Sequence, residues 1–144
     1  MKTTVNKKFN SQLPKNDVHP YRTGAWQPQS TEYTASEMPV TGEIPKDLNG
    51  VYLRNTENPL HDSLERYHPF DGDGMIHMMS FDDGVAQYRN RFVCTQGLAT
   101  EISAGSAQWA GLAEQPAQSP RTDGWGARTR MKDASSTDIV VHAG

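Results

Sequence analysis

The most regular pattern of apolar and polar positions lies in residues 75–95. An almost unbroken apolar run over 75–81 is followed by a turn-forming segment, 82–84, and then by a segment in which apolar and polar side chains alternate. One face of that returning segment carries Ala86, Tyr88, Phe92 and Cys94, and the other carries Gln87, Arg89 and Arg91. Alternation with a period of two, bounded by a turn that contains glycine, predicts a β-hairpin. We expect its first strand to be buried on both faces and its second strand on one.

Weaker signals predict the other elements. Residues 51–54 (VYLR) are typical of a strand that ends at the turn-forming residues 55–59. An Ala/Gly/Ser-rich stretch, 98–114, has the spacing of one short helix, and residues 115–129 are typical of a loop. The apolar run at 137–142 predicts a final strand. The chain is therefore expected to be all-β apart from that helix.

Residues 1–40 differ from the remainder of the chain. They contain four prolines, a local excess of basic over acidic side chains, and no sustained hydrophobic periodicity. We predict that residues 1–40 form an extended N-terminal arm with little structure of its own, and that residues 41–144 form the ordered region.

Composition narrows the possible classes of function. The net charge of −3 over 144 residues gives no electrostatic footprint for nucleic acid. The apolar runs are much shorter than the roughly 20 residues that a membrane-spanning helix needs, and the first ten residues do not resemble a secretory signal. The single cysteine, Cys94, excludes an internal disulfide and a multi-cysteine metal site, and its strand position favours a packing role. We therefore expect a cytoplasmic protein with no transmembrane segment.

The residues alone show no complete active site. His61, His68 and His77 lie close together in the sequence, but their spacings match no helix or strand pattern of metal ligands, and a hydrogen-bonded core histidine is favoured at position 77. The segment 71–74 (DGDG) lacks the later ligands of a calcium loop, which favours a turn whose carboxylates cap backbone N–H groups. A Ser-His-Asp combination at 135–142 lacks any nucleophile-elbow pattern.

Several longer blocks resemble one protein family, the carotenoid cleavage oxygenases, also called carotenoid/stilbene dioxygenases. The blocks are 42–50 (GEIPKDLNG), 52–55 (YLRN), 58–59 (NP), 68–75 (HPFDGDGM), 88–93 (YRNRFV) and 132–144 (KDASSTDIVVHAG). They follow one another in the family's order and together cover most of residues 42–144. Thr56-Glu57 departs from the Gly-Pro that is commonest in the family.

The resemblance implies a fold and a chemistry. The fold is a seven-bladed β-propeller, of which this chain would supply the N-terminal arm and the first blade or so. Family members bind Fe(2+) on the propeller axis through four histidines and leave coordination sites open for O2. They cleave a conjugated C=C bond of a carotenoid, an apocarotenoid or a lignostilbene-type stilbenoid into two carbonyl products. Imidazole ligands suit iron and its oxygen chemistry.

The resemblance also implies which residues are candidates for metal or substrate binding. The family's iron-binding histidines lie beyond the segment that matches His142, so no residue up to Gly144 is carried over as a metal ligand or catalytic group. Stilbene-cleaving members place a lysine and a tyrosine beside the substrate phenol. Lys132 matches the lysine and Tyr88 is the nearest tyrosine, and a solvent-exposed Lys132 is the alternative.

Two hypotheses from different classes follow. In the first, the chain is the N-terminal part of an iron(II)-dependent dioxygenase whose partners are a small hydrophobic carotenoid or stilbenoid and O2. The 144-residue chain alone would then be inactive and hold no iron. In the second, it is a naturally short, non-catalytic β-blade that acts as a binding or vestigial module.

Overall fold

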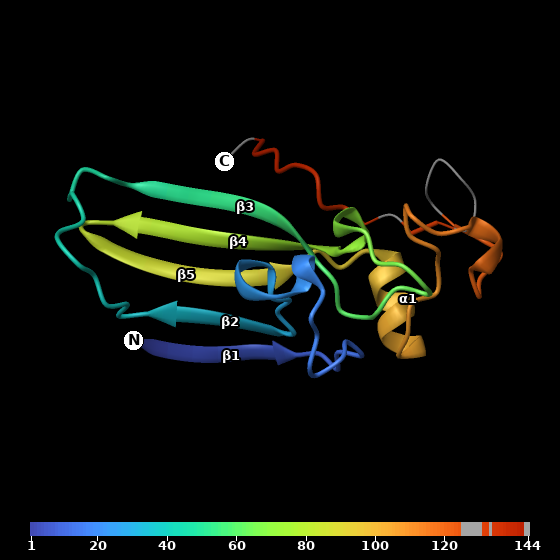
Figure 1. Cartoon of the computed structure of the whole chain (residues 1–144). Coiled ribbons are helices and arrows are strands. Elements are labelled where there is room, and N and C mark those ends of the chain that lie inside the picture. The colour runs from blue at the N-terminus through green and yellow to red at the C-terminus, as the bar shows by residue number, and fades with distance from the viewer. Residues whose placement is uncertain (125–130, 133, 143–144) are drawn as a thin grey trace.

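One antiparallel sheet forms the main body of the computed structural model (Figure 1), which describes residues 1–124, 131–132 and 134–142. Five strands follow one another across the sheet in the order β1-β2-β5-β4-β3. Their bounds are Lys2–Lys8 (β1), Thr31–Ser36 (β2), Gly50–Asn58 (β3), Asp73–Asp82 (β4) and Val85–Phe92 (β5). The helix α1, Gln96–Ala104, lies beyond one end of the sheet, and 3-10 turns span Pro20–Arg22, Gly24–Trp26, Pro69–Asp71 and Pro116–Gln118. The prediction of a mostly β chain is confirmed.

The hairpin predicted from hydrophobic alternation is β4 and β5. Its ladder runs from Met75 opposite Phe92 to Asp82 opposite Val85. Between the strands, Asp83 and Gly84 have φ values of 42° and 76°, the left-handed conformation that a two-residue turn between twisted strands requires. The Asp-Gly pair is therefore the residue choice that allows the chain to reverse here.

Burial in the hairpin departs from the expectation in two places. β4 is buried only as far as Met75, and its later residues, 76–81, are half-buried, since several of their side chains line a groove on the sheet. Cys94 is exposed, so the prediction that it packs in the interior is wrong. The physical reason is that β5 ends at Phe92, and beyond the strand the alternation no longer determines which way a side chain points.

β3 is longer than the sequence predicted. It pairs with the whole of β4, from Gly50 opposite Phe81 to Asn58 opposite Asp73. The expected stop at residue 55 is wrong because the polar side chains at this end find partners. The Thr56 hydroxyl donates to the Met75 carbonyl at 3.1 Å, and Asn58 exchanges two hydrogen bonds with the Gln29 backbone.

Residues 1–40 contain two strands, so the expectation of little regular structure there is wrong for β1 and β2. β1 pairs antiparallel with β2, and β2 with β5. Every residue of β1 is exposed, so this edge strand is held by backbone pairing and carries no apolar alternation that a sequence pattern could reveal. The boundary at residue 40 stays a prediction.

The β2–β5 contact depends on a buried side chain. The ladder itself pairs only Thr34 with Arg89 and Ala35 with Tyr88. Asn90, which is 0% exposed, continues it by accepting from the Tyr33 N–H at 2.8 Å and donating to the Thr31 carbonyl at 2.9 Å. This buried β5 amide pairs with two backbone groups of β2 and so ties the N-terminal segment to the hairpin.

The remaining segments are mostly irregular. α1 begins at Gln96, just before the stretch 98–114 predicted to hold a short helix, and ends inside that stretch. The Thr95 hydroxyl accepts from the Leu98 N–H at its start, and Gly105 has the left-handed conformation at its end. Residues 137–142 are described as irregular, so the predicted final strand is wrong. Val140 and Val141 are 82% and 66% exposed, because an apolar run forms a strand only where a neighbouring backbone pairs with it.

The core lies where the sheet meets α1. Phe9, Leu60, Met75, Phe92 and Leu98 form one buried cluster, and the rings of Phe9 and Phe92 meet edge to face at 4.8 Å between centroids. Among the described residues, no helix has the length and apolar character needed to cross a membrane.

Candidate functional site

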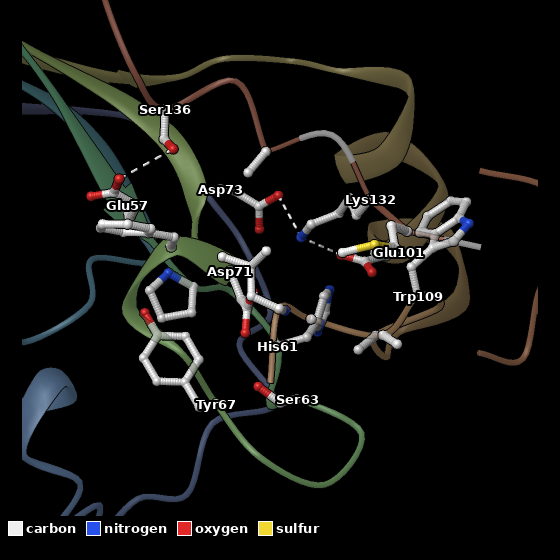
Figure 2. Close-up of a pocket in the computed structure, with 18 of the residues that line it drawn as sticks. Glu57, His61, Ser63, Tyr67, Asp71, Asp73, Glu101, Trp109, Lys132 and Ser136 are labelled. Carbon is white, nitrogen blue, oxygen red and sulfur yellow. Dashed lines mark hydrogen bonds and ion pairs between the residues drawn. The ribbon is translucent and has the colours of Figure 1, made fainter. Parts of the chain in front are cut away.

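A cleft of about 850 Å³ lies at the α1 end of the sheet (Figure 2). Its walls come from the end of β3, the start of β4, α1 and parts of the segments 59–71, 107–114 and 131–138. The acidic side chains that line it are Glu57, Asp62, Asp71, Asp73, Glu101, Glu114 and Asp138. Among the described residues of the lining, Lys132 is the one lysine or arginine.

Lys132 joins three segments in the wall of this cleft. Its Nζ lies 2.8 Å from Oδ1 of Asp73 and 2.8 Å from Oε2 of Glu101, and all three side chains are buried, with Lys132 12% exposed. Burial by itself lowers the pKa of Lys132, but the two carboxylates outweigh that effect and raise the pKa above its usual value. The ammonium is therefore held charged, and the alternative of a solvent-exposed lysine is wrong.

The chain around Lys132 is fixed to the sheet by backbone contacts as well. The Gly74 N–H donates to the Ala134 carbonyl at 2.9 Å, and the Asn55 amide donates to the Ser135 carbonyl at 3.1 Å. A Cβ on Gly74 would overlap the Ser135 carbonyl oxygen, so only glycine allows this close approach. Residues 134–136 are thus docked across the ends of β3 and β4.

The DGDG segment forms a capped turn, as predicted for Asp71. Its carboxylate accepts from the His68 N–H at 2.9 Å and from the Leu112 N–H at 2.8 Å. Burial raises the pKa of Asp71, and these two hydrogen bonds oppose that shift. Asp73 has a different role from the predicted backbone cap, because its carboxylate pairs with Lys132.

His61 lines the cleft with an imidazole ring that lacks hydrogen-bond partners among the described residues, and Asn55 Oδ1 is a second buried atom of the lining without one. His61 itself is 7% exposed. Burial lowers the pKa of His61, although Glu101 and Asp73 act to raise it, so the ring is neutral near pH 7. Figure 2 shows the His61 ring in the lining of the same cleft as Asp71 and the Lys132–Glu101 ion pair.

His77 shows the opposite situation on the hairpin. Its Nδ1 lies 2.6 Å from the Tyr88 hydroxyl and its Nε2 lies 3.1 Å from the Thr56 hydroxyl. Because the Thr56 hydroxyl donates to a backbone carbonyl, Nε2 donates to Thr56 and Nδ1 accepts from Tyr88. Burial lowers the pKa of His77 and raises that of Tyr88. The predicted hydrogen bonding of the His77 ring is confirmed, but its predicted place in the core is wrong, because the residue is half-buried.

Lys132 and Tyr88 line different hollows. Tyr88 contributes, with Trp26 and His77, to a groove of about 440 Å³ on the sheet, whereas Lys132 lines the acidic cleft. The structure therefore does not bring the two predicted substrate contacts together in one pocket, and their contact with a substrate stays a prediction.

A resident metal finds no site in this part of the chain. Among the described residues, no three histidine, cysteine, aspartate or glutamate side chains are arranged to hold an ion. Asp73 and Glu101, the two carboxylates whose charges act to raise the pKa of His61, already bind the Lys132 ammonium. The donor set described here therefore does not fit an iron centre.

Sequence reasoning missed the roles of Glu101 and His61. Glu101 carried a signal, since it is the only charged residue between Arg91 and Glu114 and lies in an Ala/Gly/Ser-rich stretch that predicts a helix. A lone charge in such a helix indicates a specific partner. His61 carried none, because an orphaned ring is a property of three-dimensional surroundings.

Comparison with known proteins adds the family. Residues 26–144 match the retinal pigment epithelial membrane protein (RPE65) family. The carotenoid cleavage oxygenase of Mycobacterium tuberculosis is 38% identical over 128 residues, which are 88% of this chain and 23% of the relative. The chain thus spans less than a quarter of that relative's length.

Solved structures agree with the sequence match. Cobalt-substituted apocarotenoid oxygenase from Synechocystis superposes with a TM-score of 0.64 at 32% identity, over 80% of this chain and 24% of that one. Lignostilbene dioxygenase from Pseudomonas brassicacearum gives a TM-score of 0.61 over 65% of this chain and 20% of that one, and at 23% identity this likeness shows the fold alone. The resemblance read from residues 42–144 is confirmed, and the chain belongs to the RPE65 family, that of the carotenoid cleavage oxygenases.

Proposed function

We propose that this chain is the N-terminal part of an iron(II)-dependent dioxygenase that cleaves a conjugated C=C bond into two carbonyl products. The observation that carries the proposal is the family match over residues 26–144, together with 38% identity to a carotenoid cleavage oxygenase. The five-stranded sheet would then belong to the start of a seven-bladed β-propeller, whose other blades lie outside the 144 residues.

Iron chemistry is proposed for the longer protein and not for this chain by itself. The described residues offer no three ligands to one ion, and Asp73 and Glu101 are engaged by Lys132. Bound iron would supply activation of O2. What this chain contributes is the five-stranded sheet, whose β4 is joined to α1 by the Lys132 ion pairs.

The substrate class proposed is a carotenoid or apocarotenoid, with a lignostilbene-type stilbenoid as the second candidate. The first is favoured because the relatives with more than 30% identity include a carotenoid cleavage oxygenase and an apocarotenoid oxygenase. The second rests on Lys132 and Tyr88 as contacts to a substrate phenol. The two side chains line separate hollows, which counts against their acting together.

The intact mass of the native protein in its source organism is the first test. We expect a mass several times 16.0 kDa, and the purified native product should hold about one iron per chain and convert an apocarotenal into two carbonyl products. The 144-residue chain, assayed beside it with added Fe(2+), should bind no stoichiometric iron and release no product.

A native mass of 16.0 kDa would contradict the proposal and favour the non-catalytic binding module. A hydroxystilbene serves as the matched second substrate in the same assay, and its preferential cleavage would move the proposal to the stilbenoid class. We also propose a cytoplasmic location, which fractionation of the source cells tests.

A further inference from the structure

The acidic cleft is lined by two side chains with buried polar atoms that lack a hydrogen-bond partner among the described residues, Asn55 at its Oδ1 and His61 at both ring nitrogens. His61 is 93% buried, as its exposed fraction of 7% shows, and both ring nitrogens lack a partner. A buried polar group left without hydrogen bonds costs roughly 1–3 kcal/mol, so native structures keep few of them. Its ring lines the cleft, where a bound molecule can reach it.

The charge of the lining determines which molecule fits. Apart from Lys132, the charged side chains among the described lining residues are all carboxylates. An anion would be repelled by them. A divalent metal ion would need three suitable ligands, and the described residues offer no such group. A neutral imidazole beside carboxylates suits a ligand that carries positive charge and N–H donors.

The cleft already shows how it binds such a group. The Lys132 ammonium lies between two carboxylate oxygens, each at 2.8 Å, in a nearly dry environment. Glu57, which lines the same cleft, accepts one hydrogen bond from the Ser136 hydroxyl at 3.3 Å among the described residues, so its carboxylate keeps acceptor capacity. The aromatic rings of the lining are already engaged by cations of this chain, since Arg22 lies over Tyr67 and Arg121 over Trp109, so the carboxylates and His61 are left to bind a ligand.

We propose that this cleft is a binding site for a small organic cation, a primary amine or guanidinium compound, which donates a hydrogen bond to His61 and is neutralised by the acidic lining. The acceptor nitrogen of the neutral ring takes one N–H of the ligand, and Glu57 takes another. The site is separate from the groove that contains Tyr88 and does not depend on the proposed dioxygenase activity.

The test uses the 144-residue chain and 1,4-diaminobutane as the probe. Calorimetry measures the affinity at neutral pH, and the imidazole resonances of His61 report the location. We expect saturable binding with a shift confined to His61 among the histidines. His61→Phe should weaken binding about tenfold, which corresponds to the loss of one charge-assisted hydrogen bond. His142→Gln, a change at an exposed histidine outside the cleft, should leave the affinity unchanged.

A second variant keeps the proposal falsifiable if His61→Phe does not fold. Glu57→Gln removes one charge from the lining and should weaken binding about threefold. Three results would overturn the proposal: no saturable binding of the diamine, an affinity that neither variant changes, or a His61 shift produced by inorganic phosphate or Zn²⁺ in place of the diamine. A His61 ring bonded only to an ordered water and unresponsive to the diamine would count equally against it.

Discussion

The two ends of the sheet are stabilised by different forces. At the hairpin end, β3, β4 and β5 are joined by continuous backbone ladders that reach Gly50 opposite Phe81. At the α1 end, irregular segments are fixed by buried charges, above all Lys132 between Asp73 and Glu101. Ladders tolerate changes of side chain, whereas a buried ion pair fails when one partner is removed. The hairpin end should therefore tolerate sequence change, whereas the α1 end, which contains the cleft, should not.

Glu114 extends this contrast. Its carboxylate accepts from the N–H groups of Glu65, Arg66 and Gly111, so one buried side chain satisfies three backbone donors from two loops. In the hairpin, by contrast, backbone N–H groups donate to carbonyl groups of the neighbouring strand. The α1 end therefore substitutes carboxylates for the strand partners that irregular segments lack.

The largest effect is expected from breaking the ion pairs. Lys132→Met leaves two carboxylates buried and unpaired, and should lower the free energy of unfolding by roughly 3–5 kcal/mol. Denaturant titration measures the change, and Lys15→Met, at an exposed lysine, is the matched control. If Lys132→Met behaved like the control, the ion pairs would not stabilise the α1 end.

Removing all three buried charges together tests whether the loss in Lys132→Met comes from unpaired carboxylates. In Lys132→Met combined with Asp73→Asn and Glu101→Gln, the buried charges are gone together, and most of the lost stability should return. A triple variant no more stable than Lys132→Met alone would mean that the ammonium contributes through packing and not through charge.

The next effect in size belongs to the core between the two ends. Met75 is 0% exposed and lies in the cluster that joins the sheet to α1. Met75→Ala should lower the free energy of unfolding by about 2–5 kcal/mol because it leaves a cavity. Met79→Ala, at a half-buried position of the same strand, is the control and should cost less. Equal losses would show that burial at position 75 is not what matters.

A smaller effect is expected at the start of α1. The Thr95 hydroxyl accepts from the Leu98 N–H at 3.0 Å, and Thr95→Ala should cost about 1 kcal/mol. Thr100→Ala serves as the control, since that hydroxyl donates to the carbonyl of Gln96 inside the helix and caps no N–H group. Thermal unfolding of both variants measures the difference, and a loss at Thr100 alone would contradict the capping role.

The smallest effect concerns pH. Burial lowers the pKa of His77 below its ordinary value of 6.5, so the unfolded chain takes up a proton before the folded one as the pH falls. The contribution of His77 to stability is therefore complete above about pH 6.5 and is lost as the pH falls through the lowered folded-state pKa. His77→Gln, which does not titrate, should flatten the decline in denaturant midpoint between about pH 7 and pH 5. An unchanged slope would mean that the hairpin histidine titrates alike in both states.

Prediction from sequence succeeded where one residue pattern corresponds to one structure. The alternation after residue 85 and the turn-forming segment 82–84 correctly predicted the hairpin, and the DGDG segment correctly predicted a turn capped by Asp71. It failed for β1, whose side chains are all exposed and whose strand depends on pairing with β2. It also failed for residues 137–142, where apolar composition was not matched by a partner strand.

For the candidate site, too, some features could be predicted from the sequence and others depend on tertiary contacts. Local composition and the order of the motifs were enough to predict the mostly β fold and membership of the carotenoid cleavage oxygenase family, because short stretches of sequence carry the patterns that indicate both. The environment of Lys132, the orphaned ring of His61 and the separation of Lys132 from Tyr88 are set by contacts between residues far apart in the chain. Only the tertiary structure decided these, since burial and ion pairing depend on which segments meet in space and not on which residues are neighbours in sequence.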